Sequence, residues 1–97
     1  MASGFVGVLT CELHFPGAHS LKEKRHVVQS LKARLRHKFN VAVAEIANQE
    51  TWQRATVAAV TVSGDRVFAE KVLQAVEDEA AEILGGTLTD TVVEWME

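Results

Sequence analysis

Four cations in the segment 19–45 have a spacing at which they could bind phosphate groups together. They follow one another at intervals of three, seven and four residues, so an α-helix at 100° per residue would place them in one stripe. Lys and Arg side chains are the usual partners of nucleic-acid phosphates. The pattern therefore predicts a basic, solvent-facing stripe, which consists of Lys22, Arg25, Lys32 and Arg36.

The start of the same helix also resembles a small-anion site. Ser20 and Glu23 have the spacing of a capping box, with the Glu23 side chain expected to reach back to the Ser20 N–H. Cations crowd the first turn, where the helix dipole disfavours them, and an anion on the free N–H groups would relieve this. The candidate site consists of Ser20, Lys22, Lys24 and Arg25. The preceding loop lacks the GxxxxGK[ST] spacing of a nucleotide cradle, and a solvated charged turn explains the same residues.

Lys24 is an exception among these cations, because helical geometry places it within the apolar stripe. Its carbon chain could lie on the core while its ammonium reaches a carboxylate of the sheet. Glu45 alternates with apolar residues along a strand and could pair with Lys24 or with Arg25. We interpret Glu45 as a member of a structural ion pair.

Two further residues, Trp52 and Arg54, are candidates for contact with a partner. Trp52 could be a lid on the edge of the core or an exposed aromatic ring for a base or a protein. Arg54 beside it favours keeping the second interpretation.

Catalysis has little support in this chain. The four histidines show no zinc-site spacing with Cys11 or with one another, and no Ser/His/Asp order has a recognisable context. Cys11 is the single cysteine, so it forms no intrachain disulfide, and we expect it in the core. The sequence predicts a non-enzymatic protein without a metal or cofactor.

The elements that must position these residues follow from periodicity and capping signals. Alternation predicts a strand over 5–15, and an apolar stripe predicts a helix from Leu21 to a left-handed Asn40. We expect strands at 41–48 and 55–62, a helix over 66–84 with Ile83 on its buried face, and a last strand over 87–95. The order βαββαβ indicates an α+β ferredoxin-like plait, with a four-stranded antiparallel sheet and two helices on one face. We expect a single domain over 1–97.

In such a plait the second face of the sheet lies open in a monomer. We expect this face to include Val6, Val8, Val41 and Val43. It is apolar enough to need a partner, so a homodimer across this face or along a sheet edge is plausible.

Charge is divided unevenly along the chain. Residues 19–38 carry seven Lys or Arg against one Glu, whereas residues 64–97 carry two against nine Asp or Glu. The two helices could therefore neutralise each other in part. No apolar run is long enough for a membrane span, and no secretory signal is evident, so the sequence favours a cytoplasmic protein.

Three segments resemble the YlxP-like family of short bacterial proteins: SLKEKR at 20–25, FNVAVAE at 39–45 and TWQRA at 51–55. The resemblance covers nearly the whole chain and implies a ferredoxin-like fold. It supplies no catalytic residues, because the family has no established biochemical activity. Its members are often encoded beside translation and ribosome-maturation factors, which implies a role near the ribosome.

Two functions from different classes follow. The first is a binding protein that associates with RNA or the ribosome, in which the basic stripe contacts phosphates. The strands lack the aromatic pattern on which RNA-recognition plaits stack bases. The second is a dimeric regulatory module that binds a small anion at the start of the first helix. A protein-interaction module that uses the basic stripe on an acidic partner would remain if both fail.

Overall fold

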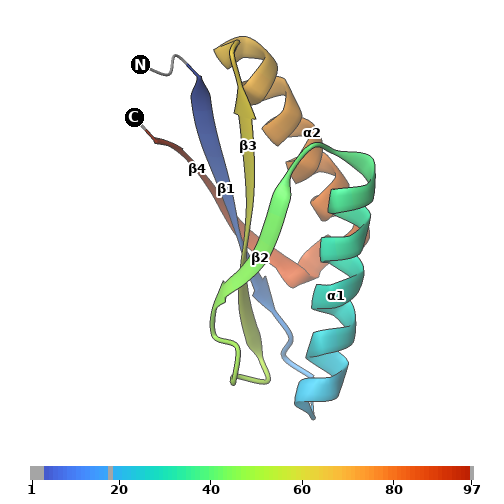
Figure 1. Ribbon diagram of the computed structural model, residues 1–97. Helices are drawn as coiled ribbons and strands as arrows, with labels where there is room; N and C mark the ends of the chain where they lie inside the picture. Colours follow the sequence, from blue (N-terminus) through green and yellow to red (C-terminus); the bar gives the residue numbers. More distant parts are fainter. Residues whose placement is uncertain (1–3, 18, 97) are drawn as a thin grey trace.

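The chain folds as βαββαβ in a computed structural model that describes residues 4–17 and 19–96. Figure 1 shows both helices on one side of the sheet. The elements, in order, are β1 (Phe5–His14), α1 (Leu21–Lys38), β2 (Ala42–Ala47), β3 (Arg54–Ser63), α2 (Arg66–Leu84), a 3₁₀ turn η1 (Gly85–Thr87) and β4 (Leu88–Met96). The predicted element order is confirmed.

All neighbouring strands of the sheet are antiparallel, in the order β2-β3-β1-β4. Helix α1 lies over the β2 side, and α2 lies over β1 and β3. This is the ferredoxin-like arrangement, and it leaves β2 and β4 as the two edges of the sheet. The described residues contain no helix with the length and apolarity that a membrane crossing requires.

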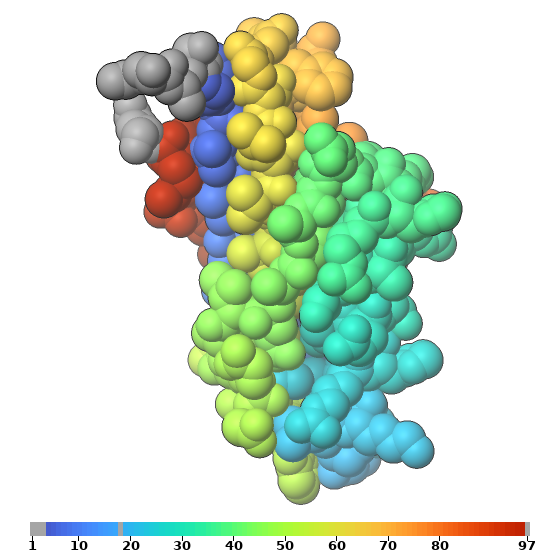
Figure 2. Space-filling model, in the orientation of Figure 1, coloured from blue at the N-terminus to red at the C-terminus, as the bar shows by residue number. Residues whose placement is uncertain are grey.

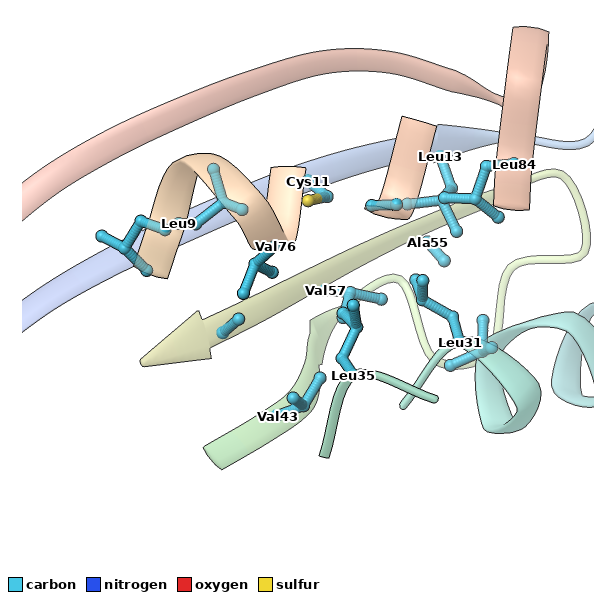
Figure 3. Packing of buried hydrophobic residues seen from close by; sticks show 14 residues of the cluster. Leu9, Cys11, Leu13, Leu31, Leu35, Val43, Ala55, Val57, Val76 and Leu84 are labelled. Atoms are coloured by element: carbon cyan, nitrogen blue, oxygen red, sulfur yellow. The ribbon is translucent and has the colours of Figure 1, made fainter. Parts of the chain in front are cut away.

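Strand β1 lies at the centre and alternates between two environments, as its sequence predicts. Leu9, Cys11 and Leu13 face the helices and are buried, whereas the residues between them are only partly covered. At Gly7 a Cβ atom would come within 2.7 Å of Leu73 Cδ1 and 2.8 Å of Trp95 Cζ3. Glycine therefore lets α2 and β4 approach the strand closely. Figure 3 shows the core between the sheet and the helices.

The end of α1 differs from the prediction. The helix stops at Lys38, and Phe39 takes an extended conformation with its N–H donated to the Leu35 carbonyl. Among the described non-glycine residues the left-handed one is Asn48, at φ 65°, in the β2–β3 connection. Asn40 therefore does not close the helix; an extended Phe39 does, with its ring packed against the core.

Helix α2 begins and ends as its sequence predicts. The Asp65 carboxylate accepts the N–H groups of Val67 and Phe68, which satisfies two free donors of the first turn. Gly85, at φ 55°, ends the helix. Ile83 departs from the prediction, because 37% of its surface is exposed at the margin of the buried face.

The open sheet face is the face that carries no helix, and its composition corrects the sequence prediction. Val43 is buried in the core, and Val41 packs against the same core before β2 begins. Strand β2 instead exposes Ala42, Ala44 and Ile46. Neighbouring residues of a strand point to opposite faces, so an error of one residue moves every side chain to the other face. The prediction for 41–48 made this error and placed the buried side of the strand outward.

Candidate nucleic-acid interface

The basic stripe lies along the solvent side of α1. Lys22, Arg25 and Arg36 are exposed and Lys32 is partly covered. None of the four side chains forms an ion pair with a residue in the described part of the chain. At a rise of 1.5 Å per residue, the stripe extends for about 21 Å. Figure 2 shows α1 forming one flank of the molecule.

Two other cations of α1 are neutralised by α2. Lys38 Nζ lies 2.7 Å from Glu79 Oε1, and Arg34 Nη1 lies 3.5 Å from Glu79 Oε2. The Glu79 side chain is mostly buried between the helices. Charge compensation between the two helices therefore exists, but it involves the side of α1 that faces α2 and leaves the basic stripe outside it.

Lys24 is fully buried, and its ammonium is occupied by the chain itself. Its Nζ lies 3.0 Å from Glu45 Oε2 and donates to the backbone carbonyls of Asn48, Gln49 and Arg54 at 2.6, 3.3 and 3.1 Å. The sequence interpretation of Glu45 as a structural ion-pair partner agrees with this geometry. The assignment of Lys24 to a nucleic-acid or anion contact is wrong, because no face of its ammonium reaches solvent.

The contacts of Lys24 fasten the β2–β3 connection to the first turns of α1. The left-handed Asn48 turns the chain, and its carbonyl also accepts the Thr51 N–H at 3.1 Å. Figures 1 and 2 show this connection beside the start of α1. The three carbonyl acceptors were not predicted from the sequence. The signal that points to them is a lysine in an apolar stripe with only one carboxylate in reach, because its ammonium needs further acceptors.

Trp52 lies in this fastened connection and is 50% exposed. The lid interpretation is therefore incomplete, since half of the surface of this residue remains open to a partner. The β2–β3 connection, which contains Trp52, and the start of α1 lie at the same end of the molecule (Figure 1).

The start of α1 provides less support for an anion site than the sequence suggested. Ser20 Oγ accepts the Glu23 N–H at 3.3 Å, as a capping box requires. The Glu23 carboxylate accepts the N–H of His19, at 3.4 Å, and not that of Ser20. The chain thus places its own negative charge at the positive end of the helix dipole, beside Lys22 and Arg25.

Arg54 belongs to a different surface from the basic stripe. It begins β3 opposite His14 of β1, at one end of the open sheet face. There a depression of about 360 Å³ is lined by Glu12, Leu13, His14, Arg54 and Thr89. Trp52 and Arg54, predicted together as partner contacts, are thus divided between the connection and the sheet.

Cys11 is the buried thiol expected from the sequence. Burial, together with the negative charges of Glu77 and Glu12, raises its pKa to about 11. Within the described residues no three His, Cys, Asp or Glu side chains are placed to hold a metal ion.

We therefore expect the native protein to resist alkylation of Cys11 by iodoacetamide at about pH 8, because only about a thousandth of this thiol is ionised there and the side chain is inaccessible. In denaturant the thiol should react at the rate of a free cysteine. Mass spectrometry of the two reactions checks this. Rapid modification of the native protein would contradict the burial of the thiol.

Comparisons with known proteins show which proteins this chain is similar to. The model of the family described as "Protein of unknown function (DUF503)" matches residues 6–93. The "Uncharacterized protein YlxP" of Bacillus subtilis (strain 168) is 45% identical over 71 residues, covering 73% of this chain and 77% of that protein. The family expected from the three sequence motifs is confirmed.

Among solved structures, the de novo designed protein Foldit4 superposes with a TM-score of 0.59 at 9% identity, covering 97% of each chain. A second designed protein, LFR1 1 with ferredoxin fold, has a TM-score of 0.49 at 10% identity and covers 95% of this chain and 82% of its own. The Foldit4 likeness concerns the fold alone.

Proposed function

We propose that this chain, which belongs to the family described as protein of unknown function DUF503, binds RNA through the basic stripe of α1 and associates with the ribosome in the cytoplasm. The observation that carries the proposal is the absence of ion-pair partners for the stripe within the described residues. Cations that are not neutralised internally can exchange their counterions for phosphates, which is the main source of affinity for nucleic acids.

The ion pairs between the two helices leave the unpaired positive charge of α1 on one side of the molecule. Glu79 compensates Arg34 and Lys38 on the side of α1 that faces α2. The remaining positive charge therefore lies on the outer side of α1, although the whole chain has a formal charge of −3. Such an uneven field orients the approach of an anionic partner even when the net charge is negative.

Trp52 lies in the connection that Lys24 fastens to the first turns of α1, where the basic stripe begins. An unpaired base could stack on its exposed ring while the adjacent phosphates contact the first cations of the stripe. The sheet is not used as in RNA-recognition plaits, because Phe5 and Trp95 lie on the helix-facing side in the register of β1 and β4. The contact is thus from helix and loop to a single-stranded or irregular RNA segment.

The proposal predicts that the protein sediments with ribosomal subunits at low salt and is released as salt rises. Neutralisation of four phosphates gives a slope of about −3 to −4 in a plot of log affinity against log salt concentration. The variant Lys22→Glu/Arg25→Glu/Lys32→Glu/Arg36→Glu should lose binding while circular dichroism remains that of the wild type. All four side chains lie outside the core, so the fold should tolerate the change.

A matched pair of single substitutions distinguishes binding by the basic stripe from a general effect of positive charge. Arg36 and Lys71 are exposed cations on α1 and α2, and neither pairs with a described residue. Arg36→Gln should reduce the salt slope by about one, whereas Lys71→Gln should leave it unchanged. Equal effects of the two, or no co-sedimentation of the wild type at low salt, would refute the proposal.

A further inference from the structure

The open sheet face exposes large apolar side chains that no described element covers. Val62 at the end of β3 is 60% exposed, and Met96, Val92 and Ile46 are exposed to a similar degree. Between them lie small or partly covered residues of the four strands. These are Val6, Val8, Thr10, Ala42, Ala44, Ala58 and Val60, and β4 adds one charged residue, Glu94, at the edge of the face.

Apart from Glu94, an exposed carboxylate on the edge strand β4 opposite Val8, the open sheet face is divided into an apolar end and a polar end. Strand register places Val62, Val6 and Met96 in one row at the apolar end. The opposite end carries Glu12, His14, Arg54 and Asp90. Thr56 Oγ1 donates to Glu12 Oε1 at 2.8 Å there, which keeps that carboxylate on this face.

We propose that the open sheet face binds a second copy of this chain, with a twofold axis parallel to the strands and between β3 and β1. Two twofold axes in the plane between the sheets would bring the open faces together, one parallel and one perpendicular to the strands. The parallel axis places the apolar end of one copy on the apolar end of the other. The perpendicular axis would place Val62 and Met96 against the charged end of the other copy, and burying charge against apolar groups is costly. Face-to-face sheets aligned in this way pack about 10 Å apart.

The same axis brings opposite charges together at the polar end. Because the strand order is β2-β3-β1-β4, β3 of one copy lies over β1 of the other. Arg54 of one copy then lies over His14 of the second copy, at the depression that Glu12, His14, Thr89 and the second copy's own Arg54 line. The Glu12 carboxylate lies two residues further along β1, within reach of the long Arg54 side chain, and the twofold axis repeats the contact on the other side.

The face is large enough for such a contact. Four strands at about 4.8 Å and a length of nine residue steps at about 3.4 Å give a footprint near 500 Å² per copy. Both copies together bury about 1,000 Å², which reaches the lower limit of specific interfaces. In this dimer α1 stays on the outer side of each sheet, so two basic stripes point away from each other. The inference does not depend on the proposed function.

Sedimentation velocity over a series of protein concentrations tests the inference. We expect reversible dimers with twice the chain mass of 10.6 kDa. Val62→Glu should raise the dissociation constant by roughly a hundredfold, because the symmetric interface carries the buried charge twice. Val67→Glu is the matched control: Val67 is 58% exposed but lies on α2, so the dimer should be unchanged.

A charge exchange tests the direction of the axis. Arg54→Glu should weaken the dimer by repulsion from Glu12, and Arg54→Glu/Glu12→Lys should restore it. A wild type that stays monomeric at every concentration would overturn the inference, as would a dimer that Val62→Glu leaves intact or that Val67→Glu weakens equally. If the folded Arg54→Glu/Glu12→Lys protein does not dimerise, the proposed direction of the twofold axis is wrong. Ribosome binding by a monomer would leave the proposed function standing.

Discussion

Substitution of Lys24 by methionine should lower the free energy of unfolding by about 3 to 5 kcal/mol, the cost of removing one partner from a buried ion pair. Methionine keeps the apolar length of the side chain but not the ammonium. The Glu45 carboxylate would then lose its cation, and three backbone carbonyls of the β2–β3 connection would lose their donor. Urea unfolding followed by circular dichroism measures the change.

Two controls distinguish the effect of losing the buried Lys24 ammonium from the effect of losing any lysine. Lys22→Met removes an exposed cation two residues earlier and should change stability by less than about 0.5 kcal/mol. In Lys24→Met/Glu45→Gln the unpaired charge is absent, so the double variant should be more stable than Lys24→Met alone. A Lys24→Met protein as stable as Lys22→Met would contradict the ion-pair geometry.

Local signals explain why most of the elements were predictable. The alternation of β1, the Ser20 and Asp65 caps and the Gly85 stop depend on residues a few positions apart, and the structure contains all four. Right-handed crossovers then leave few topologies for βαββαβ. The fold could therefore be derived without knowledge of any long-range contact.

The errors arise where two distant segments must meet in one register. The faces of β2 were exchanged at Val43, because small residues alternate with valine and give a weak pattern there. The pairing of β2 with β3 also shifts between Glu45 and Ala47, which periodicity cannot reveal. The left-handed conformation expected at Asn40 occurs at Asn48 instead. The sequence does not show this, because the position of the turn depends on where β2 ends.

The candidate interface could be predicted in part. Helical geometry predicts a basic stripe, but it does not say which cations of α1 are neutralised. That depends on Glu79, which lies 41 residues after Lys38 and reaches it only through the packing of α1 on α2. The carbonyl contacts of Lys24 likewise require the fold: a lysine in an apolar stripe indicates that its ammonium needs acceptors, but not which backbone groups supply them.

Leu31→Ala is the second large effect that we expect, at about 2 to 5 kcal/mol of lost stability. Leu31 is fully buried in the core, in the middle of the helix that carries the basic stripe. Truncation removes buried methyl groups and leaves a cavity that the surrounding side chains fill only in part. The unfolding midpoint in urea should fall while the denaturant slope stays the same.

Ile83→Ala is the matched control, since Ile83 is a large aliphatic residue of α2 that the structure leaves 37% exposed. It should cost clearly less than Leu31→Ala, because a smaller part of its surface is removed from water on folding. Equal losses would mean that Ile83 is as buried as its sequence position suggests and would contradict its exposure at the margin of α2. Under conditions where Leu31→Ala remains folded, it should still bind ribosomal subunits with the wild-type salt slope, because it retains every cation of the basic stripe. Loss of binding by this folded variant would show that charge on α1 is insufficient and that the exact position of the helix matters for recognition.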